Sequence, residues 1–220
     1  MALAQLGAGF SPLVERVLEA FDLDLGGEER AAFLARAVTF LDRAVAWNAH
    51  IDLTAARDAE ELVDLMFADA AAVVASGLDR GARWVDVGSG IGAPGLPLAL
   101  LAPGLDVTLV EPRAKRVAFL RTVLTTLGSV AVHVERCRSD TLEAGSFDVA
   151  ISRATLPPDE WLAEGARLAT ARVWVLLARG ACPSLTGWSV AREVTFRWPL
   201  TGRERRAVAF ERVGRQKIPA

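Results

Sequence analysis

Apolar side chains recur at helical spacing over the first 80 residues of the chain, which predicts three helices. Ser11-Pro12 is typical of a helix start, with Ser11 as the N-cap, and Gly26-Gly27 separates the first helix from the second. The third helix is expected to begin near Asp58. The three apolar sets are Leu13, Val17, Leu18 and Phe21; then Phe33, Leu34, Val38, Leu41 and Val45; then Leu62, Leu65, Met66, Val73 and Val74.

From residue 83 the pattern changes to short buried strands that alternate with helices, which indicates a parallel, doubly wound α/β sheet. Two alternating runs at the end of the chain predict an antiparallel hairpin. We therefore expect an N-terminal helical region over residues 1–80 and an α/β domain over residues 81–220. The expected strands are 83–87, 106–110, 130–134, 147–152 and 172–177, the helices are 95–101, 114–127 and 159–169, and the hairpin strands are 193–198 and 206–212.

The segment Asp86-Val-Gly-Ser-Gly-Ile-Gly-Ala-Pro-Gly95 follows a predicted strand and precedes a predicted helix, the context in which a glycine-rich loop indicates a cofactor site. Its spacing matches the dinucleotide fingerprint G-x-G-x-x-G, with Glu111 as a ribose ligand. The acidic residue two positions before the first glycine is instead typical of S-adenosylmethionine (SAM) methyltransferases. A carboxylate at this strand end suits the ammonium group of SAM and repels the phosphates of NAD, so SAM is favoured.

Several motifs, in order along residues 47–180, resemble those of the bacterial ribosomal RNA small subunit methyltransferase G family, also called glucose-inhibited division protein B. The loop with its Pro-Gly-Leu-Pro continuation is the most distinctive, and Phe147-Asp-Val-Ala-Ile-Ser-Arg-Ala154 matches the family pattern F-D-x-x-x-S-R-A. Further matches are Trp47-Asn48 with Ile51-Asp-Leu-Thr54 and Arg57-Asp58, Glu111 to Leu120, Arg138-Ser-Asp140 and Arg179-Gly180. The family's H-x-x-D-S motif is here Met66-Phe-Ala-Asp-Ala70, and Asp52 replaces the second asparagine of its W-N motif.

This resemblance implies a Rossmann-like class I SAM-dependent methyltransferase that acts on N7 of a guanine in 16S rRNA. It also implies that Asp140 receives the adenine amino group and that the Ser139 amide meets a ring nitrogen. Lys115 and Arg116, on the predicted helix 114–127, are placed where they could contact phosphate. The expected cofactor-binding residues are Asp86, Gly88, Ser89, Gly90, Gly92, Ala93, Glu111, Ser139, Asp140 and Arg153; the catalytic ones are Arg153 and Arg179; and the substrate-binding ones are Asn48, Thr54, Arg57, Lys115 and Arg116.

The residues around the predicted fourth strand agree with N7 chemistry. Guanine N7 carries a lone pair and no proton, so its methylation needs alignment and no general base. The Asn/Asp-Pro-Pro-aromatic tetrad that serves exocyclic amines is replaced by Ser152-Arg-Ala-Thr-Leu-Pro157. Two other hypotheses remain: a SAM-dependent methyltransferase of a small metabolite or another RNA, and a non-catalytic ribosome-binding paralogue.

The net charge of −2 conceals an uneven distribution of charged residues. Residues 1–80 carry −8, residues 81–191 carry +1 and residues 192–220 carry +5. The hairpin and tail therefore predict a basic surface for RNA, made of Arg197, Arg203, Arg205, Arg206, Arg212, Arg215 and Lys217. With no signal sequence, membrane span or metal-ligand spacing, we expect a cytoplasmic monomer without a metal.

Overall fold

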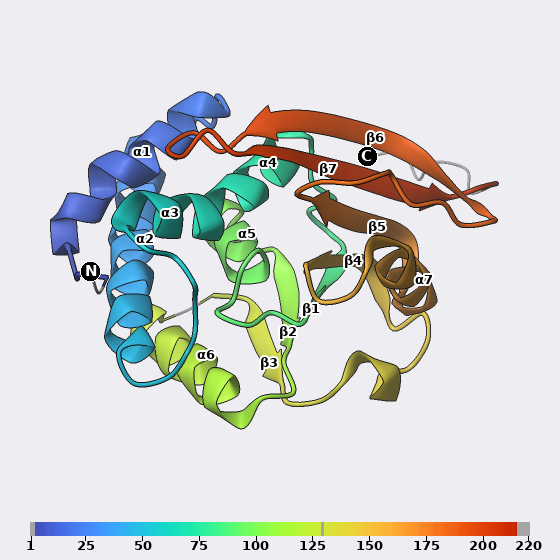
Figure 1. The fold of residues 1–220 in the computed structure, drawn as a ribbon, viewed down its shortest axis with the longest axis horizontal. Coiled ribbons are helices and arrows are strands. Elements are labelled where there is room, and N and C mark those ends of the chain that lie inside the picture. The colour runs from blue at the N-terminus through green and yellow to red at the C-terminus, as the bar shows by residue number, and fades with distance from the viewer. Residues whose placement is uncertain (1–2, 129, 215–220) are drawn as a thin grey trace.

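The computed structural model of this chain describes residues 3–128 and 130–214. Arg215 and Lys217, predicted to belong to the basic surface, lie outside the described residues. The fold is built on one seven-stranded sheet with the strand order β3-β2-β1-β4-β5-β7-β6 (Figure 1). Its strands are β1 (Arg83–Val87), β2 (Asp106–Val110), β3 (Val132–Glu135), β4 (Phe147–Arg153), β5 (Ala169–Leu177), β6 (Trp188–Arg197) and β7 (Glu204–Arg212).

The first five strands are parallel, and β7 joins β5 in the antiparallel direction. This arrangement confirms the predicted doubly wound sheet with an antiparallel C-terminal hairpin. Order reverses between β1 and β4, so a crevice is expected outside the carboxyl ends of these two strands. The connecting helices are α5 (Gly95–Leu101), α6 (Ala114–Leu127) and α7 (Pro158–Leu168).

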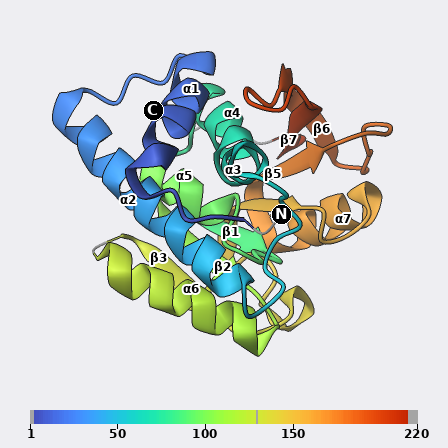
Figure 2. The ribbon, with the colours of Figure 1, turned by 60° about the vertical axis from the view of Figure 1, so that its left-hand side comes forward.

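The N-terminal helices cover one face of this sheet together with α5 and α6 (Figures 1 and 2). They are a short 3-10 turn (Gly7–Phe10), α1 (Ser11–Ala20), α2 (Gly27–Asn48), α3 (Ala59–Val63), a π-helical turn (Asp64–Ala68) and α4 (Asp69–Ala75). Phe40 and Phe67 from these helices share a hydrophobic core with Phe119 of α6 and with strand residues such as Leu109. The opposite face packs against α7, chiefly through Trp161 and Leu162.

Three local predictions need correction. Ser11 is not an N-cap, because the 3-10 turn runs directly into α1 and no side chain caps the helix. Strand β5 begins at Ala169, directly after α7, and so takes residues assigned to a helix or a loop. Strand β6 begins at Trp188, five residues before the predicted start at Glu193, because Trp188 still pairs with Arg212 of β7. The capping of α3 by Asp58, which accepts the Glu61 N–H at 2.8 Å, agrees with the predicted start.

Candidate functional site

The glycine loop leaves the carboxyl end of β1 and enters α5 at the switch point of the sheet. Gly88, Gly90 and Gly92 have φ angles of +70°, +57° and +103°, a region that residues with a Cβ rarely occupy. Gly95 is required for another reason, since a Cβ there would lie 2.5 Å from Leu109 Cδ2 and 2.8 Å from Asp86 Oδ2. The loop is therefore a tight backbone cradle pressed onto the sheet.

Asp86 lies beneath this cradle and is fully buried. Its Oδ2 accepts the Gly95 N–H at 2.9 Å, whereas Oδ1 is buried without a hydrogen-bond partner among the described residues. Burial raises the pKa of Asp86 to about 7, opposed by the Gly95 N–H and the positive charge of Arg153. A buried acceptor that lacks a donor is rare, and a cationic or N–H-bearing ligand group would satisfy it. The residues present thus fit the ammonium group of SAM.

Glu111 ends β2 and is also buried. Its two carboxylate oxygens accept the N–H groups of Gly90 at 3.0 Å and of Arg113 at 2.8 Å. Arg116, predicted to contact phosphate, has its Nη1 atom 3.8 Å from the same carboxylate and is directed at the cradle. Lys115, predicted for the same role, is exposed. A carboxylate can accept about four hydrogen bonds, so Glu111 can hold the cradle and still accept ribose hydroxyls.

Ser139 and Asp140 lie in a short 3-10 turn (Ser139–Thr141) after β3, at the same edge of the sheet as the glycine loop. The Asp140 carboxylate is exposed and pairs with Arg138, at 3.0 Å. Within the glycine loop, the predicted cofactor residues Ser89 and Ala93 are buried. The Ser89 hydroxyl donates to the Asp86 carbonyl at 2.8 Å. Ser89 thus closes the loop with its own side chain.

Arg153, the last residue of β4, points towards the N-terminal helices. Its guanidinium donates to the Leu65 carbonyl and lies 3.5 Å from Asp69 Oδ2. The other Asp69 oxygen accepts the indole N–H of Trp198 at 2.8 Å. Arg153 is therefore held in a junction between β4, α4 and the β6–β7 turn.

This junction was missed from the sequence, although one signal was available. Asp69 is the residue that persists where the H-x-x-D-S motif is otherwise altered. Asp64 completes the junction, because its fully buried carboxylate accepts from the N–H groups of Leu200 and Thr201 and from the Thr201 hydroxyl.

Two of the predicted substrate residues, Asn48 at the end of α2 and Thr54, hold the connection between α2 and α3 together. Asn48 Oδ1 accepts the N–H groups of Leu53 and Thr54, and the Thr54 hydroxyl accepts the Ala56 N–H. Arg57 is exposed, and its Nε donates to Glu61 at 3.0 Å.

The basic residues of the hairpin separate into paired and crowded groups. Arg197 and Arg206 form ion pairs with Glu204 and Glu193, at 2.7 and 3.1 Å, and Arg212 lies 5.4 Å from the centre of the Trp188 ring. In contrast, Arg205 stacks 4.0 Å above Trp198 and has no carboxylate within 4.0 Å among the described residues. Burial and three nearby arginines, Arg203, Arg153 and Arg179, lower the pKa of Arg205. Arg203 pairs with Glu61 at 2.5 Å and Arg153 with Asp69, so among the described residues the arginines without an ion pair at this edge of the sheet are Arg205 and Arg179.

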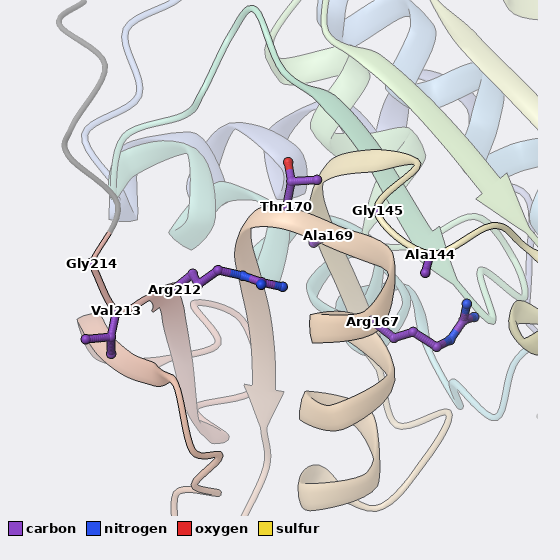
Figure 3. Close-up of a pocket in the computed structure, with 8 residues that line it drawn as sticks. All are labelled: Ala144, Gly145, Arg167, Ala169, Thr170, Arg212, Val213 and Gly214. Carbon is purple, nitrogen blue, oxygen red and sulfur yellow. The ribbon is translucent and has the colours of Figure 1, made fainter.

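Two pockets lie next to the sheet. The larger, about 500 Å³, lies at the amino end of β5 between Arg167 and Arg212, away from the glycine loop (Figure 3). The smaller, about 310 Å³, lies at the carboxyl ends of β4 and β5 and is lined by Ser152, Trp161 and Arg179 among others. We give the smaller pocket more weight, because open α/β sheets bind ligands at this edge.

Two kinds of feature are absent from residues 3–128 and 130–214. No cluster of three or more His, Cys, Asp or Glu side chains there could hold a metal ion. No helix in these ranges has the length and apolar character needed to cross a membrane.

Comparisons with known proteins agree with this geometry. Residues 34–189 match the family model of rRNA small subunit methyltransferase G. A ribosomal RNA small subunit methyltransferase G from Halorhodospira halophila is 43% identical over 61% of this chain, and the match covers 63% of that relative, less than two thirds of its length. One of the same name from Xanthomonas euvesicatoria is 32% identical over 95% of this chain and 98% of that relative. The crystal structure of a mutant of MtNAS in complex with S-adenosylmethionine superposes with a TM-score of 0.54 at 19% identity, covering 94% of this chain and 92% of that one, which supports the fold alone.

Proposed function

This chain belongs to the rRNA small subunit methyltransferase G family, and from that premise we propose that it transfers a methyl group from SAM to N7 of a guanine in 16S rRNA. The observation that carries the proposal is the glycine cradle above the buried, half-satisfied carboxylate of Asp86. When bound, SAM supplies an electrophilic methyl group on a sulfonium centre.

The residues of the crevice divide the work of holding this cofactor. Asp86 Oδ1 offers the acceptor for the ammonium group, and Glu111 offers acceptors for the ribose hydroxyls. Gly88, Gly90, Gly92 and Ala93 let the backbone approach, while Asp140 and the Ser139 amide meet the adenine edge. Because guanine N7 needs no deprotonation, the remaining task is to align the base and exclude water.

Arg153 and Arg179 are the residues that we assign to this alignment. Arg153 is fixed by Asp69 at the end of β4, and Arg179 lines the small pocket beyond β5. Both guanidinium groups carry positive charge at the edge where a base would enter. Arg153 and Arg179 are the expected catalytic residues of this site.

The RNA backbone is expected to meet the crowded arginines around Trp198. Arg205 and Arg179 have no ion-pair partner within 4.0 Å among the described residues, whereas the neighbouring Arg203 is paired with Glu61. Phosphate oxygens would relieve the mutual repulsion of these groups. Asn48, Thr54, Arg57, Lys115 and Arg116 stay secondary candidates for RNA contact. We place the enzyme in the cytoplasm with the ribosome, acting as a monomer.

Labelling tests the proposal. The protein is incubated with tritiated SAM and either 30S subunits or naked 16S rRNA, and the label is mapped by borohydride and aniline cleavage at 7-methylguanine. We expect one labelled guanine, and Arg153→Ala should lower the rate per folded molecule about 100-fold or more, with the folded fraction of each protein measured by urea denaturation. Arg83→Ala, which removes an exposed pair with Asp148, is the matched control and should retain full activity. A protein that binds SAM but labels no RNA would refute the rRNA substrate and favour a small metabolite, and a protein that binds no SAM would favour a non-catalytic ribosome-binding role.

The same RNA gives a second readout. Arg205→Gln should reduce the slope of log affinity against log salt concentration by about one, because one phosphate contact is lost. Arg212→Gln, at the opposite end of the same strand β7, should leave the slope unchanged.

A further inference from the structure

Arg167, in the last turn of α7, connects that helix to the turn that carries Ser139 and Asp140. Its Nη2 donates to the Ser139 carbonyl at 2.7 Å and its Nη1 to the Leu142 carbonyl at 2.8 Å. Figure 3 shows the Arg167 side chain directed away from Arg212, which lines the same pocket. The guanidinium thus reaches both ends of the 3-10 turn from a regular helix.

Glu164, three residues earlier on α7, orients this guanidinium. Its two carboxylate oxygens accept from Arg167 Nε and Nη2, both at 2.9 Å, in a bidentate pair. The hydrogen bond between them lowers the pKa of Glu164 and raises the pKa of Arg167, so both groups are charged at neutral pH. A bidentate pair fixes the plane of the Arg167 guanidinium group, so that its remaining N–H groups are directed at the carbonyls of the turn.

Apart from Arg167, the turn is held by a side-chain hydrogen bond from Ser139 to Glu164 and by the pair between Arg138 and Asp140. It spans three residues, and its other bonds are local: Leu142 N–H to the Ser139 carbonyl at 3.0 Å and the Thr141 hydroxyl to the Arg138 carbonyl at 2.7 Å. The Asp140 side chain is 58% exposed. Because a peptide unit is planar, the bond that Arg167 makes to the Ser139 carbonyl also fixes the plane from which Asp140 projects.

We propose that Arg167, held by Glu164, is a positioning residue that aims the Ser139–Asp140 turn at the adenine of the cofactor. The inference rests on the proposed function, in which Asp140 and the Ser139 amide read the adenine edge. Arg167 touches neither cofactor nor substrate in this role. It sets how well the turn distinguishes adenine from other bases, and Glu164 sets the geometry of Arg167.

Calorimetry with two ligands tests this role. The probes are S-adenosylhomocysteine and S-inosylhomocysteine, in which a carbonyl replaces the adenine amino group and a ring N–H replaces the ring nitrogen. The wild type should prefer the adenosine ligand by about tenfold or more, since both contacts of the turn become mismatched in the inosine ligand. Arg167→Met keeps the aliphatic stem but no donors, and it should weaken adenosine binding about tenfold while changing inosine binding little.

The ratio of the two dissociation constants separates positioning from a loss of stability, which would leave that ratio unchanged. Glu164→Gln should lower the ratio by less than Arg167→Met, and Arg197→Met, which breaks an exposed pair with Glu204, is the matched control with an unchanged ratio. A wild-type ratio retained in Arg167→Met would overturn the inference. A wild type that binds neither ligand would refute the proposed function, and equal binding of both by the wild type would refute the role of Asp140 and the inference with it.

Discussion

The glycine cradle and the junction at Trp198 both contain buried carboxylates, yet they are satisfied in different ways. Asp86 accepts from Gly95, nine residues later in the chain. Asp64 and Asp69 accept from the β6–β7 turn, between 129 and 137 residues away. The cradle is therefore complete once β1, β2 and α5 form, whereas the junction exists only when the hairpin has docked on the N-terminal helices. A change in the junction should affect the whole fold, and a change in the cradle should affect ligand binding more selectively.

The largest effect is expected from breaking the junction with Asp69→Ala. This change leaves the Arg153 charge and the Trp198 N–H without their acceptor, and breaking a buried pair costs about 3–5 kcal/mol of unfolding free energy. Urea denaturation measures this loss, and Glu204→Ala, which removes a highly exposed pair with Arg197, should cost no more than about 1 kcal/mol. An Asp69→Ala protein as stable as the wild type would show that the junction does not hold the hairpin.

The same contrast explains what could be predicted from the sequence. The cradle is a contiguous motif between a strand and a helix, so its glycines and Asp86 were accessible to local reasoning, as was the alternation of strands and helices around it. The junction depends on which of many arginines and tryptophans meet after folding, and no spacing along the chain encodes that. The basic surface was predicted over the whole hairpin, because charge counts could not show that Arg197 and Arg206 are paired while Arg205 stacks on Trp198.

The site residues show the same division. Glu111 was predicted from its position at a strand end, but its bonds to the N–H groups of Gly90 and Arg113 depend on three-dimensional packing. Asn48 and Thr54 were expected to contact substrate, and their side chains hold their own connection. The assignment of the individual site residues and the division of the chain at residue 80 remain predictions.

The next effect, in the cradle, is a dependence of stability on pH. The pKa of Asp86 is raised to about 7, above the value near 3.9 expected for an unfolded aspartate, so between these values the folded state binds a proton that the unfolded state does not. The free energy of unfolding should therefore fall as pH rises from about 4 to about 7, by as much as a few kcal/mol.

Urea titrations at pH 5 and pH 8 check this prediction, and Asp86→Asn should flatten the dependence. Asp148→Asn is the control, because hydrogen bonding by the Arg83 N–H lowers the pKa of Asp148 and its contribution is lost only as pH falls below about 4. Equal pH dependence in wild type and Asp86→Asn would mean that Asp86 is ionised in the folded protein throughout this range.

The smallest effects come from removing one hydroxyl in each region. Ser89→Ala loses the bond to the Asp86 carbonyl, and Thr201→Val loses one of the bonds to Asp64, so each should cost about 1 kcal/mol of unfolding free energy. Calorimetric titration with SAM then measures how each change affects cofactor affinity. In the wild type the Ser89 hydroxyl donates to the Asp86 carbonyl and is not directed at the cofactor. The Ser89→Ala protein should therefore bind SAM with an affinity within about twofold of that of Thr201→Val. A tenfold weaker affinity in Ser89→Ala alone would mean that the hydroxyl rotates to the cofactor, and that the cradle contributes a side chain as well as backbone to the site.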